Sequence, residues 1–245
     1  EVRAAAAQAL GMLKDAAGLE ALAAALGAST NATEQKLYTQ EAIRIIAVQP
    51  LDQVVKIAQS PDPTIRELAV KSLAEFARER PNPRVVKVLR RYLADKTPSI
   101  RQAAVYALAR VKDPGVVADL IGMKGDADPI IREQVAHAMS QAVHPDAESI
   151  LITYLDDTDN RVKLRAIQAV RERKLMAAFD KLKWLVEYRQ TEIRREVVKT
   201  VCVLAEPGDP SLFDTYQNRL YDEDGEIRLL AVTALGHYVG DPRIA

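Results

Sequence analysis

A short apolar pattern that recurs along the whole chain is the feature that most constrains its fold. Within residues 100–111, the side chains of Ile100, Ala104, Ala107, Leu108 and Val111 share one face of a helix with 3.6 residues per turn. A degenerate copy begins at Tyr38, and copies followed by Arg or Lys begin at Val2, Ile65, Ile131, Val162, Ile193 and Ile227. The eight starts are separated by 36, 27, 35, 31, 31, 31 and 34 residues. A period of this length predicts a stacked helical repeat.

Each repeat is predicted to contain two helices, and the second, which carries the apolar pattern, is called the signature helix. A more variable partner helix precedes it, as in the predicted helix over residues 178–188. Aspartates three residues before the first apolar position are expected to cap signature helices, namely Asp62, Asp128, Asp159 and Asp224. The sequence therefore predicts an all-α protein, a right-handed α-solenoid (superhelix) of about seven to eight helix pairs. It is expected to form a single domain over residues 1–245.

Composition and charge limit the classes of function. Lys plus Arg and Asp plus Glu both number 34, and the resulting net charge of zero argues against general binding of a phosphate backbone. The single cysteine, Cys202, excludes an internal disulfide framework and favours a reducing compartment such as the cytoplasm, although the localisation stays open. The apolar runs are too short to insert in a membrane. Because the chain opens inside a repeat and closes on a link, we interpret it as a segment of a longer protein.

The run [Val/Ile]-Arg-x-x-Ala-x-x-Ala-Leu, with Asp-x-x before it, resembles HEAT repeats. It is most similar to the short HEAT-like type first named from phycobilisome lyases and widespread in bacteria. Residues 2–11, 100–108 and 227–236 match well, whereas the repeat near Tyr38 departs most. The resemblance covers essentially the whole chain and implies an armadillo-like helical scaffold for protein–protein interaction. It implies no narrower function, because such repeats host many roles.

The basic residue that follows each first apolar residue has two interpretations. One is a cationic ladder for an acidic partner. The interpretation that we favour is an internal, structural ladder in which each side chain bridges an acidic link of its own or a neighbouring repeat. Aspartates recur in these links, and a planar guanidinium suits a carboxylate. The ladder comprises Arg3, Arg66, Arg101, Arg132, Lys163, Arg194 and Arg228.

A partner-binding face is predicted from the register of the signature helices. With the first apolar residue as position 0, positions 0, 4, 7, 8 and 11 are expected to be buried, and positions 2, 6 and 9 to point the opposite way. Solenoids usually bind on the concave surface that their repeats share. We interpret the central strip as a peptide groove with Tyr106 as its anchor, and an ordinary solvated face is the alternative. The predicted residues are Lys71, Gln102, Tyr106, Arg110, Glu133, His137, Gln168 and Lys199.

A second contact is predicted on the outer face of the partner helix over residues 178–188. Trp184 aligns with the outward positions of the neighbouring repeats, and Tyr188 follows one helical turn later. We interpret this aromatic pair as a contact with another chain or domain. In the alternative, the helix is rotated and both rings pack inward.

The sequence contains no recognisable catalytic or cofactor-binding set. His137, His144 and His237 lie in different repeats without the spacing of a zinc site. Adjacent His-Glu pairs, which HEAT-like metal hydroxylases of the deoxyhypusine type use for iron, are also absent. Cys202 is interpreted as an inert thiol. We therefore expect no enzyme activity, no metal and no cofactor.

Three functions compete. The favoured one is a non-catalytic scaffold or adaptor module that binds another protein, or a neighbouring domain of the same chain. A lyase-like or chaperone subunit acting on a chromophore-carrying protein is suggested by the repeat type alone. Nucleic-acid binding would need a local basic strip, and its candidates are Arg44, Lys71, Arg110, Arg171, Arg195 and Lys199. It ranks last because acidic residues interrupt that strip at Glu67, Glu75, Glu133, Glu172 and Glu196.

Overall fold

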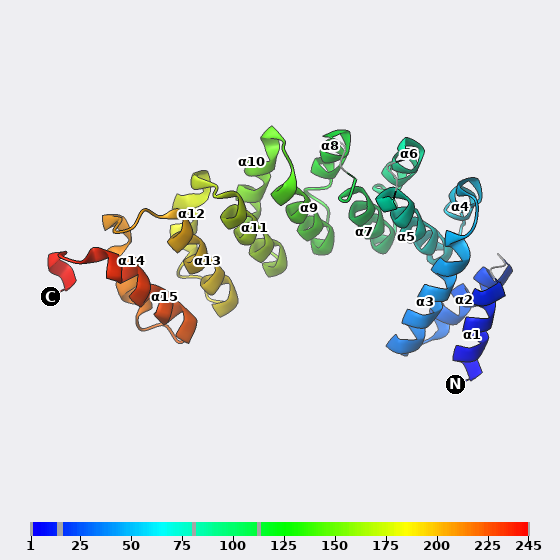
Figure 1. Ribbon diagram of the computed structural model, residues 1–245, viewed down its shortest axis with the longest axis horizontal. Helices are drawn as coiled ribbons and strands as arrows, with labels where there is room; N and C mark the ends of the chain where they lie inside the picture. Colours follow the sequence, from blue (N-terminus) through cyan, green and yellow to red (C-terminus); the bar gives the residue numbers. More distant parts are fainter. Residues whose placement is uncertain (1, 14–16, 80–81, 112–113, 245) are drawn as a thin grey trace. The chain divides into compact units, whose positions relative to one another are not determined.

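The computed structural model describes residues 2–13, 17–79, 82–111 and 114–244. Within these ranges the chain forms fifteen α-helices and four short 3-10 helices, and the same ranges contain no strand (Figure 1). The prediction of an all-α protein built from helix pairs is therefore confirmed.

Two compact units, Glu1–Met123 and Lys124–Ala245, make up the chain, and the single domain over residues 1–245 stays a prediction. The helices of unit 1 are α1 (Val2–Leu13), α2 (Ala17–Ala28), α3 (Ala32–Ala47), α4 (Leu51–Ile57), α5 (Pro63–Glu79), α6 (Pro83–Tyr92), α7 (Pro98–Leu108) and α8 (Pro114–Gly122). The α-helices of unit 2 are α9 (Pro129–Gln141), α10 (Pro145–Tyr154), α11 (Asn160–Arg173), α12 (Phe179–Leu185), α13 (Thr191–Leu204), α14 (Phe213–Arg219) and α15 (Gly225–Leu235). Four 3-10 helices complete unit 2: η1 (Met176–Ala178), η2 (Pro210–Leu212), η3 (Gly236–Tyr238) and η4 (Pro242–Ile244).

The signature helices stack directly on one another within each unit. In unit 1, α3 packs on α1 and α5, and α5 packs on α7. In unit 2, the row runs α9, α11, α13, α15, and the partner helices α10, α12 and α14 pack beside it (Figure 1). Each partner helix therefore contacts a signature helix, as a helix-pair repeat requires.

Aspartate side chains cap several signature helices, as predicted. The Oδ1 atoms of Asp62, Asp128 and Asp159 each accept a hydrogen bond from the backbone N–H two residues further on. Asp224 accepts two such bonds, from the N–H groups of Glu226 and Ile227, both at 3.0 Å. These contacts satisfy donors that a helix start leaves unpaired, so the links define where each signature helix begins.

Burial along the signature helices follows the predicted register only in part. Ile100, Ala104, Ala107 and Leu108 are fully buried, as predicted for positions 0, 4, 7 and 8, whereas Val2 at position 0 of α1 is exposed.

The outward direction predicted for position 9 holds only in part, because Gly11, Ala74 and Ser140 are buried there, whereas Ala47 and Gly236 are exposed. Position 5, which was not predicted to be buried, holds the buried residues Val70, Ile167 and Val198. Each of their helices packs on a signature helix at both flanks, so more than one helix face is covered.

Candidate functional site

Basic side chains at position 1 of the signature helices fold back onto the links that precede them. Arg132 donates from Nη1 to the carbonyl oxygens of Asp126 and Ala127, at 2.8 and 3.2 Å. Arg194 makes the same pair of bonds to the two carbonyl groups at the corresponding place in its own link. The pattern repeats, always with carbonyls six and five residues earlier, at Arg66, Arg101 and Arg228. The guanidinium therefore fixes the link against its own helix.

The other edge of the guanidinium reaches an aspartate in the next repeat, five residues before that repeat's first apolar position. Arg132 makes two bonds of 2.8 Å to Asp157, and Arg194 makes bonds of 2.7 and 2.9 Å to Asp222. Both carboxylates also accept the backbone N–H two residues further on, which forms the turn of their own link. We call this arrangement, shared with a longer Arg66–Asp95 contact, the inter-repeat clasp.

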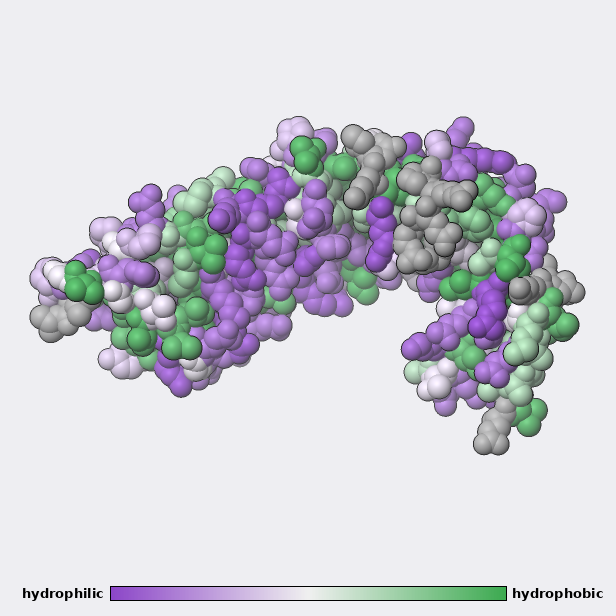
Figure 2. Space-filling model, viewed as in Figure 1, coloured by the Kyte–Doolittle hydropathy of each residue, from purple (hydrophilic) through white to green (hydrophobic). Residues whose placement is uncertain are grey.

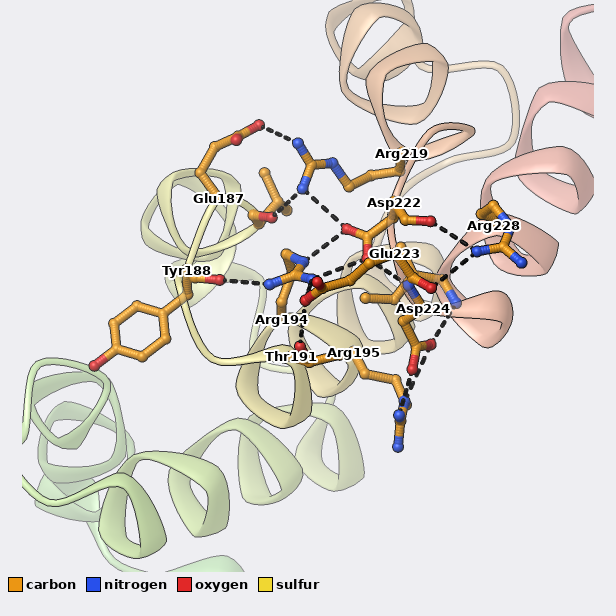
Figure 3. Close-up of polar contacts among 12 residues, drawn as sticks. Glu187, Tyr188, Thr191, Arg194, Arg195, Arg219, Asp222, Glu223, Asp224 and Arg228 are labelled. Atoms are coloured by element: carbon orange, nitrogen blue, oxygen red, sulfur yellow. Dashed lines mark hydrogen bonds and ion pairs between the residues drawn. The ribbon is translucent and has the colours of Figure 1, made fainter.

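The clasp at Arg194 and Asp222 is the most deeply buried of these pairs. Their side chains are 8% and 2% exposed. Figure 3 shows how the acidic link converges on the guanidinium, with Glu223 accepting from Arg194 at 3.1 Å and from Thr191 at 2.7 Å. Arg219 adds a second cation to Asp222 at 3.2 Å. The hydrogen bond from Arg194 outweighs burial and holds the pKa of Asp222 below its usual range, so the carboxylate is charged in the folded protein.

One clasp is built from different chemistry. At position 1 of α11 the basic residue is Lys163, and the residue in the next link that corresponds to Asp157 and Asp222 is Tyr188. The Nζ atom of Lys163 lies 5.1 Å from the centre of the Tyr188 ring and donates to the carbonyl of Leu155 at 2.7 Å. A cation–π contact therefore replaces the ion pair at this joint.

The two ends of the ladder differ from its interior. Arg228 bonds only the carbonyls of its own link, and no carboxylate contacts it among the residues that the structure describes. Arg3 is exposed, and no contact is recorded for it within the described ranges.

A second set of contacts between repeats was not predicted from the sequence. Eight residues before the first apolar position, Tyr92 and Tyr154 donate from their hydroxyl groups to the carbonyls of Ala58 and Lys124, at 2.6 and 2.8 Å. Arg219 occupies the same place and donates to the matching carbonyl of the preceding link at 3.2 Å. The recurrence of tyrosine at one register position was the available signal.

In unit 1, the predicted binding strip lies on α5 and α7 and on the turn that follows α7. The Nζ atom of Lys71 lies 2.5 Å from Oε1 of Glu67, so this cation is paired on its own helix. Gln102 is half-buried one turn before Tyr106. Tyr106 is 48% exposed, and the guanidinium carbon of Arg110 lies 3.8 Å above the centre of its ring. This stacked pair is the aromatic element of the strip.

In unit 2, the predicted strip is polar and its members contact their neighbours. Glu133 and His137 are one turn apart on α9, and the His137 ring touches the guanidinium of Arg165 on α11. The same Arg165 donates to Gln168 at 3.3 Å. Lys199 on α13 pairs with Glu226 of α15 at 2.7 Å. These contacts hold the strip residues in place.

The structure corrects the predicted aromatic pair on the outer face. Trp184 is 85% exposed, as predicted for an outward position. Tyr188 does not share that face, because α12 ends at Leu185 and Tyr188 lies in the link beyond it. Its ring is half-buried, and its hydroxyl lies 3.3 Å from Oδ1 of Asn160. The register of a helix could not apply to a residue beyond the helix end, and only Trp184 remains an exposed contact candidate.

Apolar side chains gather over α14 and α15 in the view of Figure 2, whereas hydrophilic ones cover α9, α11 and α13. Val232 at position 5 of α15 is 57% exposed, and Leu229 is exposed beside it. The residues that correspond to Val232 in α11 and α13, Ile167 and Val198, are buried, and each of these helices packs on a further signature helix. This face of α15 is therefore chemically suited to packing against another helix.

Metal-ligating side chains do not cluster in the described ranges. These ranges contain no set of three or more His, Cys, Asp or Glu side chains that could hold a metal. Cys202 lines a crevice of about 150 Å³ with Tyr216, Leu230 and His237, and burial raises the pKa of its thiol. The thiol form therefore dominates at neutral pH. Among the described helices, none combines the length and apolar character that crossing a membrane needs.

Comparison with known protein families agrees with this geometry. The family model for HEAT repeats matches residues 51–140 and 121–202, and the model for the PBS lyase HEAT-like repeat matches residues 2–28. The first of these covers more than half of the chain, and the chain therefore belongs to the HEAT-repeat family. Among curated proteins, none matches this chain.

Several solved structures share the fold. The Escherichia coli protein YibA is 17% identical with a TM-score of 0.65, over 96% of this chain and 85% of that one. A designed armadillo repeat protein in complex with the peptide (KR)4 is 18% identical with a TM-score of 0.56, over 78% and 100%. The complex of CpcE and CpcF of phycocyanin lyase from a Nostoc species is 19% identical with a TM-score of 0.52, over 78% and 77%. These similarities establish an α-solenoid of the HEAT and armadillo type.

Replacing Arg194 with Met should lower the free energy of unfolding by about 3 kcal/mol, because it leaves the buried Asp222 carboxylate with a weakened set of partners. Arg228→Met is the matched control at the same register position, and we expect a loss below about 1 kcal/mol because its guanidinium has no carboxylate partner in the described chain. Urea unfolding followed by helical circular dichroism measures both. Equal losses at the two positions would contradict the role of the clasp.

An Arg–Asp pair like those of the other clasps should be able to replace the contact between Lys163 and Tyr188. We expect the double variant Lys163→Arg/Tyr188→Asp to be more stable than the sum of its single variants by about 1 kcal/mol, because only the pair restores a guanidinium facing a carboxylate. Urea unfolding of the four proteins gives this coupling. Strict additivity would show that the two side chains do not act together.

Lowering the pH should destabilise the link that contains Asp224, because the Asp224 side chain becomes protonated. The hydrogen bond from Arg195, with the N–H groups of Ile227 and Glu226, lowers the pKa of Asp224 to about 2. Because this folded value lies below the unfolded value of about 3.9, the stabilisation is complete above about pH 4 and is lost as the pH falls toward about 2. Asp224→Asn keeps a capping oxygen but no charge. Its urea midpoint should lie below that of the wild type at neutral pH and approach it in acid, and a gap independent of pH would refute the assignment.

Proposed function

We propose that this chain is a non-catalytic scaffold or adaptor module that binds another protein, or a neighbouring domain of its own chain, through the predicted strip. The observation that carries the proposal is Tyr106, an exposed aromatic side chain among the polar residues of the strip in unit 1. Stacking against Arg110 restrains the ring, so little side-chain entropy is lost when a partner covers it. Rigid aromatic anchors of this kind often dominate the energy of a protein interface.

The charge arrangement around the strip favours a protein over a nucleic acid. Arg171 and Lys199 both pair with Glu196, at 2.7 and 3.3 Å. Arg195 pairs with Asp224 and Glu226, and Arg44 pairs with Glu41. A phosphate backbone would have to compete with these internal carboxylates for nearly every cation that nucleic-acid binding requires.

The similarity in fold also supports partner binding, because the solved relatives include a complex with a peptide and a complex of two repeat proteins. The second of these, from a phycocyanin lyase, keeps a lyase-like or chaperone role on a chromophore-carrying protein as the alternative. This alternative is supported by the shared fold and by the match to the PBS lyase HEAT-like repeat at residues 2–28. Adding a bilin and recording an absorbance shift tests that alternative directly.

Selection from a displayed library of random peptides, with the intact chain as bait, tests the scaffold proposal. Peptides that bind the strip should lose about 1–2 kcal/mol of binding free energy with Tyr106→Ala, about 5- to 30-fold in Kd, because the truncated anchor no longer fills the interface. Titration calorimetry or fluorescence anisotropy measures the loss.

Trp184→Ala provides the control, because it removes a still more exposed aromatic side chain from the outer face. The strip-binding peptides should keep their affinity for this variant, and circular dichroism should show that both variants fold. A selection whose peptides are all insensitive to Tyr106→Ala would refute the strip as the binding surface.

A further inference from the structure

The contacts of Arg110 set it apart from the other basic side chains of this face. Six cations were assigned to the face from the sequence, and in the structure five of them pair with carboxylates: Arg44, Lys71, Arg171, Arg195 and Lys199. Arg110 is the sixth. Its one recorded side-chain contact within the described ranges is with the ring of Tyr106.

Stacking gives this guanidinium a defined orientation. The group is planar, and its carbon lies 3.8 Å from the centre of the Tyr106 ring, within the range of a cation–π contact. No hydrogen bond or ion pair within the described ranges takes up its N–H groups, so they remain available as donors. Arg110 lies in the turn directly after α7, where it is exposed. It therefore presents an oriented and accessible set of donors.

We propose that Arg110 binds a carboxylate of the partner, supplied by an Asp or Glu side chain of a peptide segment that covers Tyr106. The inference rests on the proposed function, and it specifies the chemistry of the partner at one point of the strip. A carboxylate matches the fork of the guanidinium and can form two parallel hydrogen bonds with it. The Tyr106 ring supplies the apolar contact beside this polar one.

The surroundings favour one acidic side chain over a run of negative charges. On the neighbouring helix, Lys71 is neutralised by Glu67, and Glu67 also accepts a hydrogen bond from Ser99 at 2.5 Å. A second acidic group at that place would meet the Glu67 carboxylate instead of a free cation. Among its described residues, the strip in unit 1 therefore offers a single site for an anion, at Arg110.

The test uses the intact chain and the Tyr106-dependent peptides from the displayed library. Each peptide is synthesised with its Asp or Glu and with the isosteric Asn or Gln at the same place. For the acidic peptide, Arg110→Gln should raise Kd about tenfold, and Arg110→Lys should give an intermediate loss because the charge remains while the fork is lost. For the amide peptide, the rise in Kd with Arg110→Gln should be clearly smaller, because only the restraint on the Tyr106 ring is then lost.

Arg91→Gln is the control, since Arg91 is exposed on partner helix α6 and should not affect either peptide. Tyr106-dependent peptides without an acidic preference, or with equal losses for the acid and amide forms, would overturn the assignment to Arg110 alone. A library without any Tyr106-dependent peptide would overturn the proposed function together with this inference.

Discussion

The fold depends on apolar contact between neighbouring signature helices, because one helix pair is too thin to bury its own apolar face. Val70 and Ile167 are buried on helices that pack on a signature helix at both flanks, whereas Val232, at the same position of α15, is exposed, and within the described residues α15 packs on one signature helix. Apolar contact alone leaves helices free to slide and rotate, since it is not directional. The inter-repeat clasp supplies direction: Asp222 shapes its own link and receives Arg194 from the preceding repeat. One carboxylate thus couples a local turn to the register of the stack.

Much of this arrangement could be predicted from the sequence, because it follows from spacing. The recurring apolar positions predicted the helix pairs, and aspartates such as Asp128 predicted the helix starts. Recurrence of Arg with Asp suggested an internal ladder, although the carbonyl groups that Arg132 also binds have no sequence signal. Positions 5 and 9 were misjudged for a physical reason. A single helix considered alone has one apolar face, whereas a helix inside a stack has three neighbours and correspondingly more buried positions.

The candidate site was less predictable, because it depends on where helices end and on which charges pair. The placement of Tyr188 assumed a helix that continues to residue 188, but α12 stops at Leu185 and the ring turns to Lys163. The exposure of Tyr106 was predictable from its register, whereas its stacking on Arg110 was not, because a residue in a turn has no fixed direction. A sequence also does not show with which of several nearby carboxylates a flexible Lys or Arg side chain forms an ion pair.

Internal pairing of charges explains how a chain with zero net charge can still recognise a charged partner. Where every cation has its own carboxylate, as Lys199 has in Glu226, an incoming anion must displace a group that is already held nearby, and little affinity results. A cation that contacts an aromatic ring keeps its hydrogen-bond donors, so an incoming anion does not have to displace a carboxylate from it. Specificity then arises from the few unpaired positions, and the repeats around them act as a rigid support. Within the described residues, two basic side chains contact a tyrosine ring and have no carboxylate partner, namely Arg110 at Tyr106 and Lys163 at Tyr188. Only the first is at the surface of the strip, where a partner can reach it, because Lys163 is buried and donates to the carbonyl of Leu155.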